Sequence, residues 1–523
     1  MTSNATAAEA AREIRSASPF ASGTAIVLYF ALARMALYCL AGPHYGYFRD
    51  ELYYLACGEH PAWGYVDQPP LIAWVAWLLE HTTGTSLWAL RLLPALAGAA
   101  TIVLAGELAR KLGGRRWAML LASLAALMAP ISLAFSHLFT MNALDPLLWT
   151  GIACLVVQIA KSGREPLWIF VGALAGITIL NKYGVVFWLA GLMLGVCLTP
   201  LRESLRHRWF WLGGVLAAAI ALPNFLWQRQ YQFPFLQLMH NIRLHGRDIA
   251  LAPLAFLGAQ AQMLGYAAAL LVPAALLFFF SKKGRPFRAL GWGYLVFLAE
   301  MMTLHGKMYY LAPVYPMVFA AGAVWVEGAT ERKLWVWAKP ALAVAIAALG
   351  GVYAPTILPI LSVPNFLAYE HRLGIEQQKF ENQPQGVLPQ LYADMFGWEE
   401  VAQRVAAYYR TLSPEEQRKT AIFANNYGDA GAIDFFGPRY GLPKAIGNHQ
   451  NYWIWGPREY TGESLIVLGE GHERNMKEHC ASYSIIGNTK DPLSRPDEWK
   501  PIYHCRGYEW NLQEIWPRMK HWD

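Results

Sequence analysis

Long apolar stretches separated by short charged breaks dominate the first two thirds of the chain. From about Gly23 to Pro359, stretches of roughly 20 apolar residues recur, the first being Ile26–Leu40. A helix of that length crosses about 30 Å of hydrocarbon. After Pro364, Glu, Gln, Asn and Arg are interspersed among aromatic residues, as in a water-soluble domain. The pattern predicts a transmembrane domain over residues 1–361 and a soluble domain over residues 362–523.

Basic residues set the expected orientation of about eleven transmembrane helices. Lys and Arg gather in every second connection, so the positive-inside rule places these connections and the N-terminus in the cytoplasm. The clusters are Arg12 and Arg15; Arg110, Lys111, Arg115 and Arg116; Lys161 and Arg164; Arg202, Arg206 and Arg208; Lys282, Lys283, Arg285 and Arg288; and Arg332, Lys333 and Lys339. The intervening connections, 43–85, 137–144, about 181–184, 229–252 and 303–308, then face outward, together with the C-terminal domain.

The soluble tail shows the pattern of a small α/β unit. Short apolar runs at Thr420–Ala424 and Ser464–Leu468 predict strands, and Ala430–Phe436 between them predicts a helix. Its Trp and Tyr residues could form a sugar-stacking surface, but core and membrane-facing packing is the favoured interpretation. The pattern assigns the tail no catalytic role.

Composition supports the membrane assignment and excludes several classes of protein. Of 523 residues, 55% are apolar and 15% charged, whereas soluble domains carry about 25% charged residues. The net charge of +7 follows from the basic cytoplasmic connections, so we expect no nucleic-acid partner. The sequence contains no Walker A, GxGxxG or GxSxG motif and no Cys/His spacing typical of zinc sites.

Cysteine positions agree with this layout. Three of the six cysteines, Cys39, Cys154 and Cys197, lie in apolar runs, where a small buried hydrophobe is expected. Cys480 and Cys505 are the two cysteines of the tail, and in an oxidising compartment they are candidates for a disulfide.

The first outward connection, residues 43–85, carries the richest set of polar side chains. Asp50, Glu51 and Asp67 stand among tyrosines and tryptophans beside the membrane boundary. A solvated loop with an aromatic belt would explain the aromatics. A solvated loop explains the acids less well, because a carboxylate near the bilayer is costly unless it is paired or takes part in function. The apolar stretch that begins at the paired prolines Pro69 and Pro70 is too short to span and predicts an interfacial helix.

Later outward connections add a second acid and several cations. Asp145 follows His137 and precedes a proline, so it is either a helix N-cap or a cavity acid, and the two roles are compatible. Lys182 interrupts two apolar runs and could also snorkel to the surface. Further cations and aromatics of the outward connections are Arg243, Lys307 and Tyr310. Acids with cations suit a site that activates an acceptor hydroxyl and neutralises a phosphate.

Several segments resemble a known family. RDELYYLACGEHPAWGYVDQPPLIAW, RLLPALAGAATIVLAGELARKLGG, NALDPLL and GITILNKYG are similar to the bacterial branch of the protein O-mannosyltransferase and lipid A aminoarabinose transferase superfamily, which consists of GT-C glycosyltransferases of the family 39 type. The tail segments AIFANNYGDAGAIDFFGPRYGLP and NYWIWGP resemble the outer C-terminal domain of one bacterial subset. The implied fold is an α-helical polytopic GT-C membrane domain followed by a periplasmic α/β domain.

The resemblance implies transfer of a sugar from a polyprenyl phosphate to a lipid, glycan or protein hydroxyl, with inversion, on the outer face of the bacterial inner membrane. Asp50 matches the general base, Glu51 its partner, and Asp145 the acid of the second outer loop. Lys182, Arg243, Lys307 and Tyr310 are the candidates for the donor phosphate. The substrate cavity would include Tyr53, Tyr65, Asp67, Gln68 and His137.

Two departures from the aminoarabinose branch bear on the substrate. Gln68 stands where that branch has Lys before the paired prolines, and Tyr53 stands where it has Arg. Both argue against aminoarabinose or lipid A. No cofactor is expected; a divalent cation could relieve repulsion between the acids, but the first loop lacks a D-x-D pattern and we predict no metal. The rival function is a transporter or flippase, which polar residues within apolar spans would also suit.

Overall fold

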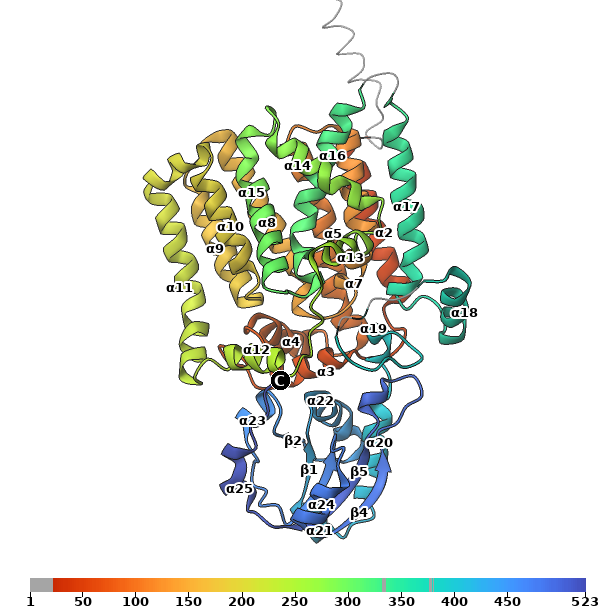
Figure 1. The fold of residues 1–523 in the computed structure, drawn as a ribbon. Coiled ribbons are helices and arrows are strands. Elements are labelled where there is room, and N and C mark those ends of the chain that lie inside the picture. Colours follow the sequence, from red (N-terminus) through yellow and green to blue (C-terminus); the bar gives the residue numbers. More distant parts are fainter. Residues whose placement is uncertain (1–21, 332–334, 376–378, 380) are drawn as a thin grey trace, which may run out of the picture.

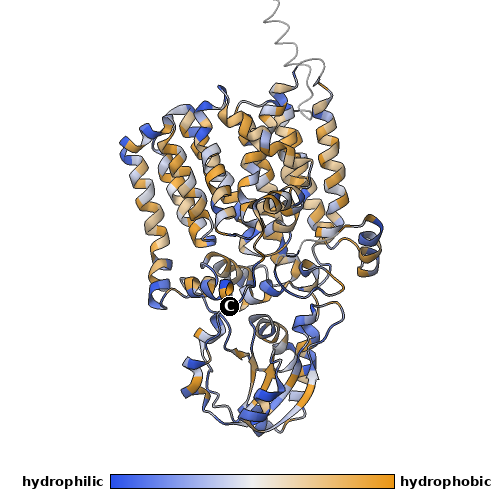
Figure 2. Cartoon of the chain, viewed as in Figure 1, coloured by the Kyte–Doolittle hydropathy of each residue, from blue (hydrophilic) through white to orange (hydrophobic). Residues whose placement is uncertain are grey.

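The computed structural model describes residues 22–331, 335–375, 379 and 381–523. Four members of the basic clusters, Arg12, Arg15, Arg332 and Lys333, lie outside the described residues. Helices make up the first part of the chain, and all five strands of the sheet lie in the tail, below the helices in Figure 1. Apolar residues cover the helices of the first part, and hydrophilic residues are frequent on the tail and at the helix ends (Figure 2).

Six segments of the described chain are long and apolar enough to cross a membrane, and two bent helix pairs raise this number to eight. The predicted number of about eleven spans stays a prediction. The six segments are α2 (Gly23–Ala41), α5 (Leu87–Lys111), Met141–Ser162 containing α8 (Asp145–Ser162), α11 (Arg208–Gln230), Met308–Ala329 containing α16 (Tyr315–Ala329), and α17 (Ala338–Ile357). The bent pairs are α10 (Val185–Cys197) with Pro200–Arg206, and α13 (Pro253–Met263) with Ala268–Phe280, which contains α14 (Leu271–Phe280).

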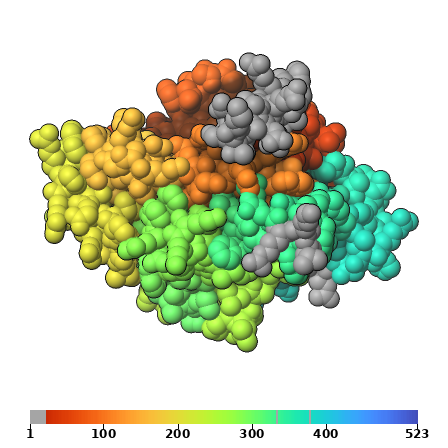
Figure 3. Space-filling view, turned by 90° about the horizontal axis from the view of Figure 1, so that it is seen from above, coloured from red at the N-terminus to blue at the C-terminus, as the bar shows by residue number. Residues whose placement is uncertain are grey.

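Shorter helices complete the helical part. They are α3 (Arg49–Glu59), α4 (Leu71–Thr82), α6 (Arg116–Met128), α7 (Pro130–Phe135), α9 (Leu167–Asn181), α12 (Pro234–Leu244) and α15 (Arg288–Thr303). Among them, α3, α4 and α12 lie at the end of the helical part next to the soluble domain (Figure 1). Helix α4 corresponds to the predicted interfacial helix after the paired prolines. Viewed from above in Figure 3, the helical part is elongated, with α11 (yellow) at one edge and the cyan segment that follows α17 at the opposite one.

The outer helices have the surface that a hydrocarbon solvent requires. Only 17% of the apolar window of α11 is buried, and its Val215 is 64% exposed. In water such a surface would be unfavourable, whereas in lipid the backbone is satisfied inside the helix and the side chains contact acyl chains. Inside, α9 and α11 approach so closely that a Cβ on Gly172 would lie 2.0 Å from the carbonyl oxygen of Gly213. Small residues at such crossings are typical of membrane helix pairs.

The tail folds around a five-stranded mixed sheet with strand order β2-β1-β3-β5-β4. The strands are β1 (Thr420–Ala424), β2 (Ile446–Gly447), β3 (Ser464–Leu468), β4 (Cys480–Asn488) and β5 (Pro501–Tyr508). Strand β1 is parallel to β2 and β3, and β5 is antiparallel to β3 and β4. The two predicted strands are β1 and β3, and the predicted helix lies within α22 (Tyr427–Phe436). The predicted C-terminal α/β domain is confirmed.

Helices cover both faces of this sheet, which explains why every residue of β1 and β3 is buried. On one face Ile422 and Ile466 pack against α20 (Trp398–Tyr409) and α22. On the other face Phe423 and Val467 pack with residues near α24 (Glu473–His479) and α25 (Leu512–Ile515). The remaining helices of this region are α18 (Val363–Leu373), α19 (Gln390–Ala393), α21 (Pro414–Lys419) and α23 (Asn451–Trp455).

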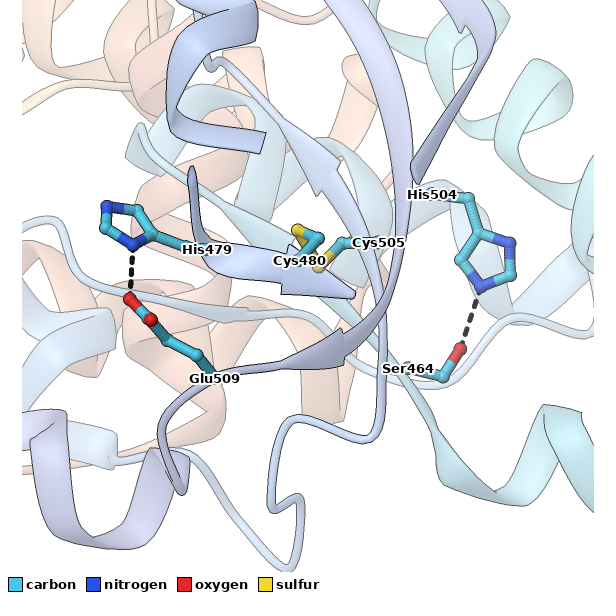
Figure 4. The surroundings of a disulfide bond; sticks show 6 residues. All are labelled: Ser464, His479, Cys480, His504, Cys505 and Glu509. Carbon is cyan, nitrogen blue, oxygen red and sulfur yellow. Dashed lines mark hydrogen bonds and ion pairs between the residues drawn. A yellow bond between two sulfur atoms is a disulfide. The ribbon is translucent and has the colours of Figure 1, made fainter. Parts of the chain in front are cut away.

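A disulfide joins the two antiparallel strands at the edge of the sheet. Cys480 at the start of β4 and Cys505 in β5 are bonded, with their Cα atoms 5.6 Å apart (Figure 4). The other four cysteines are free thiols. The pair proposed from the sequence is therefore the pair that the structure joins.

The soluble domain docks on the helical part through α22 and α3. A Cβ added to Gly431 would lie 3.2 Å from the carbonyl carbon of Leu52, and one added to Gly428 would lie 2.8 Å from Cγ of Arg49. Glycine at 431 lets α22 approach the backbone of α3, and glycine at 428 leaves room for the side chain of Arg49. The contact places the start of α22 beside the start of α3, as Figure 1 shows.

Candidate active site

A cavity of about 290 Å³ lies where the membrane helices meet the soluble domain. Four of the predicted outward connections contribute to its wall, through Asp50 and Asp67, Asn142, Arg247, and Lys307. The soluble domain adds Tyr427. Segments far apart in the sequence therefore meet at one end of the helical part, and we call this space the interface cavity.

Asp50 is a partly exposed carboxylate of the first outward connection and lines the interface cavity. It lies in the first turn of α3, where negative charge interacts favourably with the helix dipole. Its side chain is 31% exposed, and Nε of Arg49 lies 3.9 Å from Oδ1. The hydroxyl of Tyr427 donates a hydrogen bond of 2.9 Å to the same oxygen. Asp50 thus keeps one carboxylate oxygen available to a ligand in the interface cavity.

Glu51 points the other way and is fully buried. Its carboxylate accepts hydrogen bonds from the backbone N–H groups of Phe48 and Phe139, both at 2.9 Å. It also pairs with Arg91 through Nε at 3.3 Å and a terminal nitrogen at 3.2 Å. Arg91 in turn donates to the carbonyls of Gly42, His44 and Gly46. Glu51 therefore ties the first and second outward connections together and does not line the interface cavity.

Asp67 is the second acid of the first outward connection to reach the interface cavity. The hydroxyl of Tyr53 donates to it at 3.0 Å. Burial raises the pKa of Asp67 to about 7, although the Tyr53 hydrogen bond opposes the shift. Burial also raises the pKa of Tyr53 well above its usual value, so the phenol stays protonated and acts as the donor of this hydrogen bond. Asp67 can therefore change protonation near neutral pH.

Three other residues expected at the cavity have different surroundings. The hydroxyl of Tyr65 donates to the carbonyls of Cys57 and His60, each at 3.0 Å, and so shapes the loop. The side-chain amide of Gln68 lies 3.6 Å from the sulfur of Cys57. His137 is 2% exposed. None of Tyr65, Gln68 and His137 is part of the cavity wall.

Asp145 and Lys182 lie behind the wall of the interface cavity. Asp145 is the first residue of α8, and its side chain accepts a 2.7 Å hydrogen bond from Asn181. The N-cap residue is Leu144, and Asp145 makes no capping hydrogen bond. Lys182 donates at 2.5 Å to Oδ1 of Asn142, which does line the cavity.

Two tyrosine rings flank the ammonium group of Lys182. Its Nζ lies 5.2 Å from the ring centre of Tyr309 and 4.9 Å from that of Tyr310. Both distances are within the range of cation–π attraction. Tyr309 also lines the interface cavity, so its side chain separates the Lys182 ammonium group from that cavity.

Lys307 reaches the interface cavity but is already paired with acids. Its Nζ lies 3.0 Å from Oδ1 of Asp248 and 3.0 Å from Oε1 of Glu381. Arg247 also binds Glu381, at 3.3 Å. Burial would raise the pKa of Glu381, but Lys307 and Arg247 outweigh it and hold that pKa well below its usual value. Much of the positive charge of Lys307 is therefore balanced.

Arg243 is exposed and is not part of the cavity wall. It lies in the last turn of α12, whereas Arg247 follows the end of that helix and lines the cavity. The role of Arg243 at the donor phosphate stays a prediction, and Arg247, four residues later, is the cation of this connection that lines the cavity.

Sequence reasoning missed the contribution of the soluble domain. Tyr427 comes from a segment that was assigned no catalytic role, and it contacts the acid that the sequence favoured most. Arg49 and Glu381 were also not singled out, and both line the interface cavity. No local pattern marks them, because their partners are distant in sequence: Arg49 bonds to Glu498, 449 residues away, and Glu381 bonds to Lys307, 74 residues away.

One group of side chains beside the interface cavity has the composition of a metal site. Ligand atoms of His449, His521 and Asp523 lie within 4.8 Å of one another. However, Nδ1 of His449 accepts the backbone N–H of Tyr427, so its proton lies on Nε2, facing Asp523 at 3.4 Å. A histidine that binds a metal through Nε2 needs its proton on Nδ1. The arrangement favours a hydrogen-bonded His–Asp cluster.

Two sequence comparisons match parts of the chain to known glycosyltransferases. Residues 67–227 match the family described as dolichyl-phosphate-mannose-protein mannosyltransferase. A lipid A galacturonosyltransferase, RgtD, of Rhizobium johnstonii is 29% identical over 213 residues, which are 40% of this chain and 44% of that protein. The chain thus matches less than half of the length of this relative.

Solved structures extend the likeness to nearly the whole chain. ArnT from Cupriavidus metallidurans bound to undecaprenyl phosphate superposes with a TM-score of 0.60 at 14% identity, covering 91% of this chain and 97% of that one. The apo form of the same protein gives a TM-score of 0.56 with the same coverage. The expected GT-C fold is confirmed, and the protein is a multi-pass membrane protein similar to the glycosyltransferase family 39 type.

Proposed function

We propose that this family 39-like GT-C protein is a membrane glycosyltransferase that moves a sugar from a polyprenyl phosphate to a hydroxyl of a lipid or glycan at the interface cavity. The observation that carries the proposal is Asp50, an accessible carboxylate at the boundary between membrane helices and soluble domain. The undecaprenyl phosphate bound to the structurally similar ArnT supports the donor class. We place the reaction on the periplasmic face of the bacterial inner membrane, with the N-terminus in the cytoplasm.

Asp50 acts in this proposal as the general base. The acceptor hydroxyl attacks the anomeric carbon of the donor sugar and passes its proton to Asp50. The bond between that carbon and the phosphate oxygen breaks in the same step, so the configuration inverts and polyprenyl phosphate leaves. The hydrogen bond from Tyr427 fixes the carboxylate, and a positioned base typically contributes about 10²–10⁴-fold to the rate.

The leaving phosphate needs positive charge close to its oxygens. Lys182 suits this role best, because its hydrogen bond and ring contacts are with the neutral groups Asn142, Tyr309 and Tyr310. Asp145 also attracts its charge, but no ion pair within 4.0 Å joins the two among the described residues. Lys307 lies in the wall itself, but Asp248 and Glu381 already balance its charge. We therefore assign the phosphate to Lys182 with Tyr309, and a supporting role to Lys307.

Part of the interface cavity is suited to the hydrocarbon chain of the donor. Its wall includes Phe135 and Leu138, in and just after α7, and Leu238, Met239 and Ile242 of α12. A wall that combines these apolar side chains with charged ones matches an amphipathic lipid phosphate. This arrangement is what a donor held by its tail in the bilayer requires.

The acceptor class follows from the similar transferase. A lipid A galacturonosyltransferase shares 29% identity over part of the chain, so we propose a lipid A-type glycolipid as acceptor and a hexosyl or pentosyl unit as the transferred sugar. The departures at Tyr53 and Gln68 argued against both aminoarabinose and lipid A. The similarity to this transferase reverses that expectation for lipid A, so the departures now bear on the sugar alone, and we propose one other than aminoarabinose. In the structure the hydroxyl of Tyr53 donates a hydrogen bond to Asp67.

A turnover assay with purified protein tests the proposal. The protein in detergent is mixed with radiolabelled polyprenyl-phosphate sugar and a lipid A-type acceptor, and release of polyprenyl phosphate is measured. We expect Asp50→Asn to lower kcat by at least about 10²-fold. Asp491→Asn, a change in the soluble domain outside the wall of the interface cavity, should keep full activity.

The same assay separates this proposal from the rival transporter or flippase. A detergent micelle does not separate two compartments, so a transporter or flippase would release no polyprenyl phosphate in this assay. Activity that survives in Asp50→Asn would remove the base assignment. No turnover with donors carrying hexose, pentose or uronic acid would favour the transporter.

A further inference from the structure

A second cavity, of about 270 Å³, lies in the soluble domain on the face of the sheet that carries α24 and α25. It shares no wall residue with the interface cavity. In Figure 1 α22 lies next to the membrane helices, whereas α24 lies farther from them. The apolar floor of this cavity comes from β1, β3 and β5. Nothing in the proposed transfer reaction uses it.

An aromatic group forms one side of this second cavity. Trp510 is 41% exposed, and its ring centre lies 4.6 Å from that of His479 and 5.6 Å from that of Tyr508. His479 is held by Glu509, as Figure 4 shows beside the disulfide. Among the described residues from 381 onward, Trp510 is the only large aromatic residue among the strongly exposed apolar ones. An exposed tryptophan backed by two rings is a rigid stacking surface.

Amide side chains form the polar part of the same wall. Asn425, Asn448 and Asn475 line the cavity together with the carboxylate of Glu470. Asn475 donates to Glu470 at 2.9 Å. Within the described chain, the side-chain oxygen of Asn448 is buried without a hydrogen-bond partner. Each amide offers both donors and an acceptor, the combination that sugar hydroxyls pair with.

From these features we propose that the second cavity is a saccharide-binding site. A pyranose ring presents an apolar C–H face that stacks on Trp510 and hydroxyl groups that pair with Asn425, Asn448 and Asn475. The described wall contains Glu470 but no Lys or Arg, which disfavours a phosphate or another anion. Its polar amides and its place far from the membrane helices disfavour a lipid chain.

The site is held in shape before any ligand arrives. Cys505 forms part of the wall, and its disulfide to Cys480 fixes β5 to the strand that follows α24. A preformed site loses less conformational entropy on binding. His504 points to the opposite face of the sheet, where it contacts Ser464 at 2.8 Å (Figure 4).

The saccharide site is also connected to the interface cavity through the chain. The backbone N–H of His521 donates to the carbonyl of Asn448 at 3.0 Å, and Asn448 directly precedes His449 of the cluster beside that cavity. The site would therefore take the glycan part of a glycolipid whose lipid part remains in the membrane. This last step rests on the proposed function, whereas saccharide binding itself does not.

Direct binding to the full-length protein in detergent tests the site without any donor present. The probe is the core oligosaccharide released from lipopolysaccharide by mild acid, and binding is measured by calorimetry and saturation-transfer NMR. We expect a Kd below about 1 mM and at least a tenfold weaker Kd in Trp510→Ala, which corresponds to about 1.4 kcal/mol. Asn475→Ala should weaken binding by a smaller factor.

Two control variants make the outcome specific. Trp335→Ala removes a tryptophan that is 53% exposed in the helical part, and it should leave the Kd unchanged. Asp50→Asn should also bind the oligosaccharide normally, so a failure of the transferase proposal would not disturb this measurement. No saturable binding to the wild-type protein, or equal Kd values for the wild-type protein and Trp510→Ala, would overturn the proposed site.

Discussion

Replacing Glu51 with glutamine separates a structural role from a catalytic one. The carboxylate is fully buried with Arg91, and it accepts the N–H groups of Phe48 and Phe139. A glutamine keeps one oxygen acceptor but places an NH₂ group against hydrogen-bond donors. It also leaves the guanidinium of Arg91 without its counter-charge.

The size of the effect follows from that geometry. Removing one partner of a buried ion pair costs about 3–5 kcal/mol, because the remaining charge stays buried without compensation. A cost of about 3 kcal/mol corresponds to roughly a hundredfold shift of the opening equilibrium. We therefore expect the amides of Phe48 and Phe139 to exchange with solvent deuterium about a hundredfold faster in Glu51→Gln.

Hydrogen exchange followed by mass spectrometry measures this opening in detergent. Glu59→Gln is the matched control on the same helix, because Glu59 pairs with Lys444 at the half-exposed surface, and such pairs contribute about 0–1 kcal/mol. The reasoning is refuted if Glu51→Gln keeps normal exchange at Phe139 but loses turnover. That result would make Glu51 a residue that acts on the substrate.

Three further outcomes are expected. Burial raises the pKa of Asp67 to about 7, above about 3.9 in the unfolded chain, so its contribution to stability is complete below about pH 4 and is lost as the pH rises through 7. Unfolding midpoints measured from pH 4 to 8 should show a smaller decline in Asp67→Asn, and an unchanged pH profile would contradict the assignment. Lys182→Gln should lower kcat/KM for the polyprenyl-phosphate donor by about 10²-fold; the surface change Lys161→Gln is its control, and equal losses in both variants would exclude a specific phosphate contact. Replacing Cys480 and Cys505 by serine opens a link with a sequence separation of 25, which should lower the free energy of unfolding of the soluble domain by about 3 kcal/mol; urea denaturation monitored by circular dichroism checks this, and a loss below about 0.5 kcal/mol would speak against it.

The sequence predicted the general architecture because that part depends on local composition. Apolar length set the membrane helices, and β1 and β3 were visible as short apolar runs. The presence of Asp50 at the cavity was also predictable, since a carboxylate at a membrane boundary is costly unless it is paired or used. These features depend on a residue and its near neighbours along the chain.

The direction of each side chain was harder to predict. Asp50 and Glu51 are adjacent, and successive residues of a helix point about 100° apart, so one faces the interface cavity and the other faces Arg91. Which of the two acids faces the interface cavity depends on where α22 docks. Likewise, the balance of charge at Lys307 depends on Glu381, which lies 74 residues further along the chain.

The docking of α22 on α3 has a consequence for how such proteins can be recombined. The general base proposed in the membrane domain accepts a hydrogen bond from the soluble domain. Two glycines of α22 also lie close against α3, Gly431 against its backbone and Gly428 against the side chain of Arg49. The soluble domain is therefore not a portable module. A chimaera that exchanges it for the tail of a related transferase should need α3 from the same parent, and the two segments should vary together when homologues diverge.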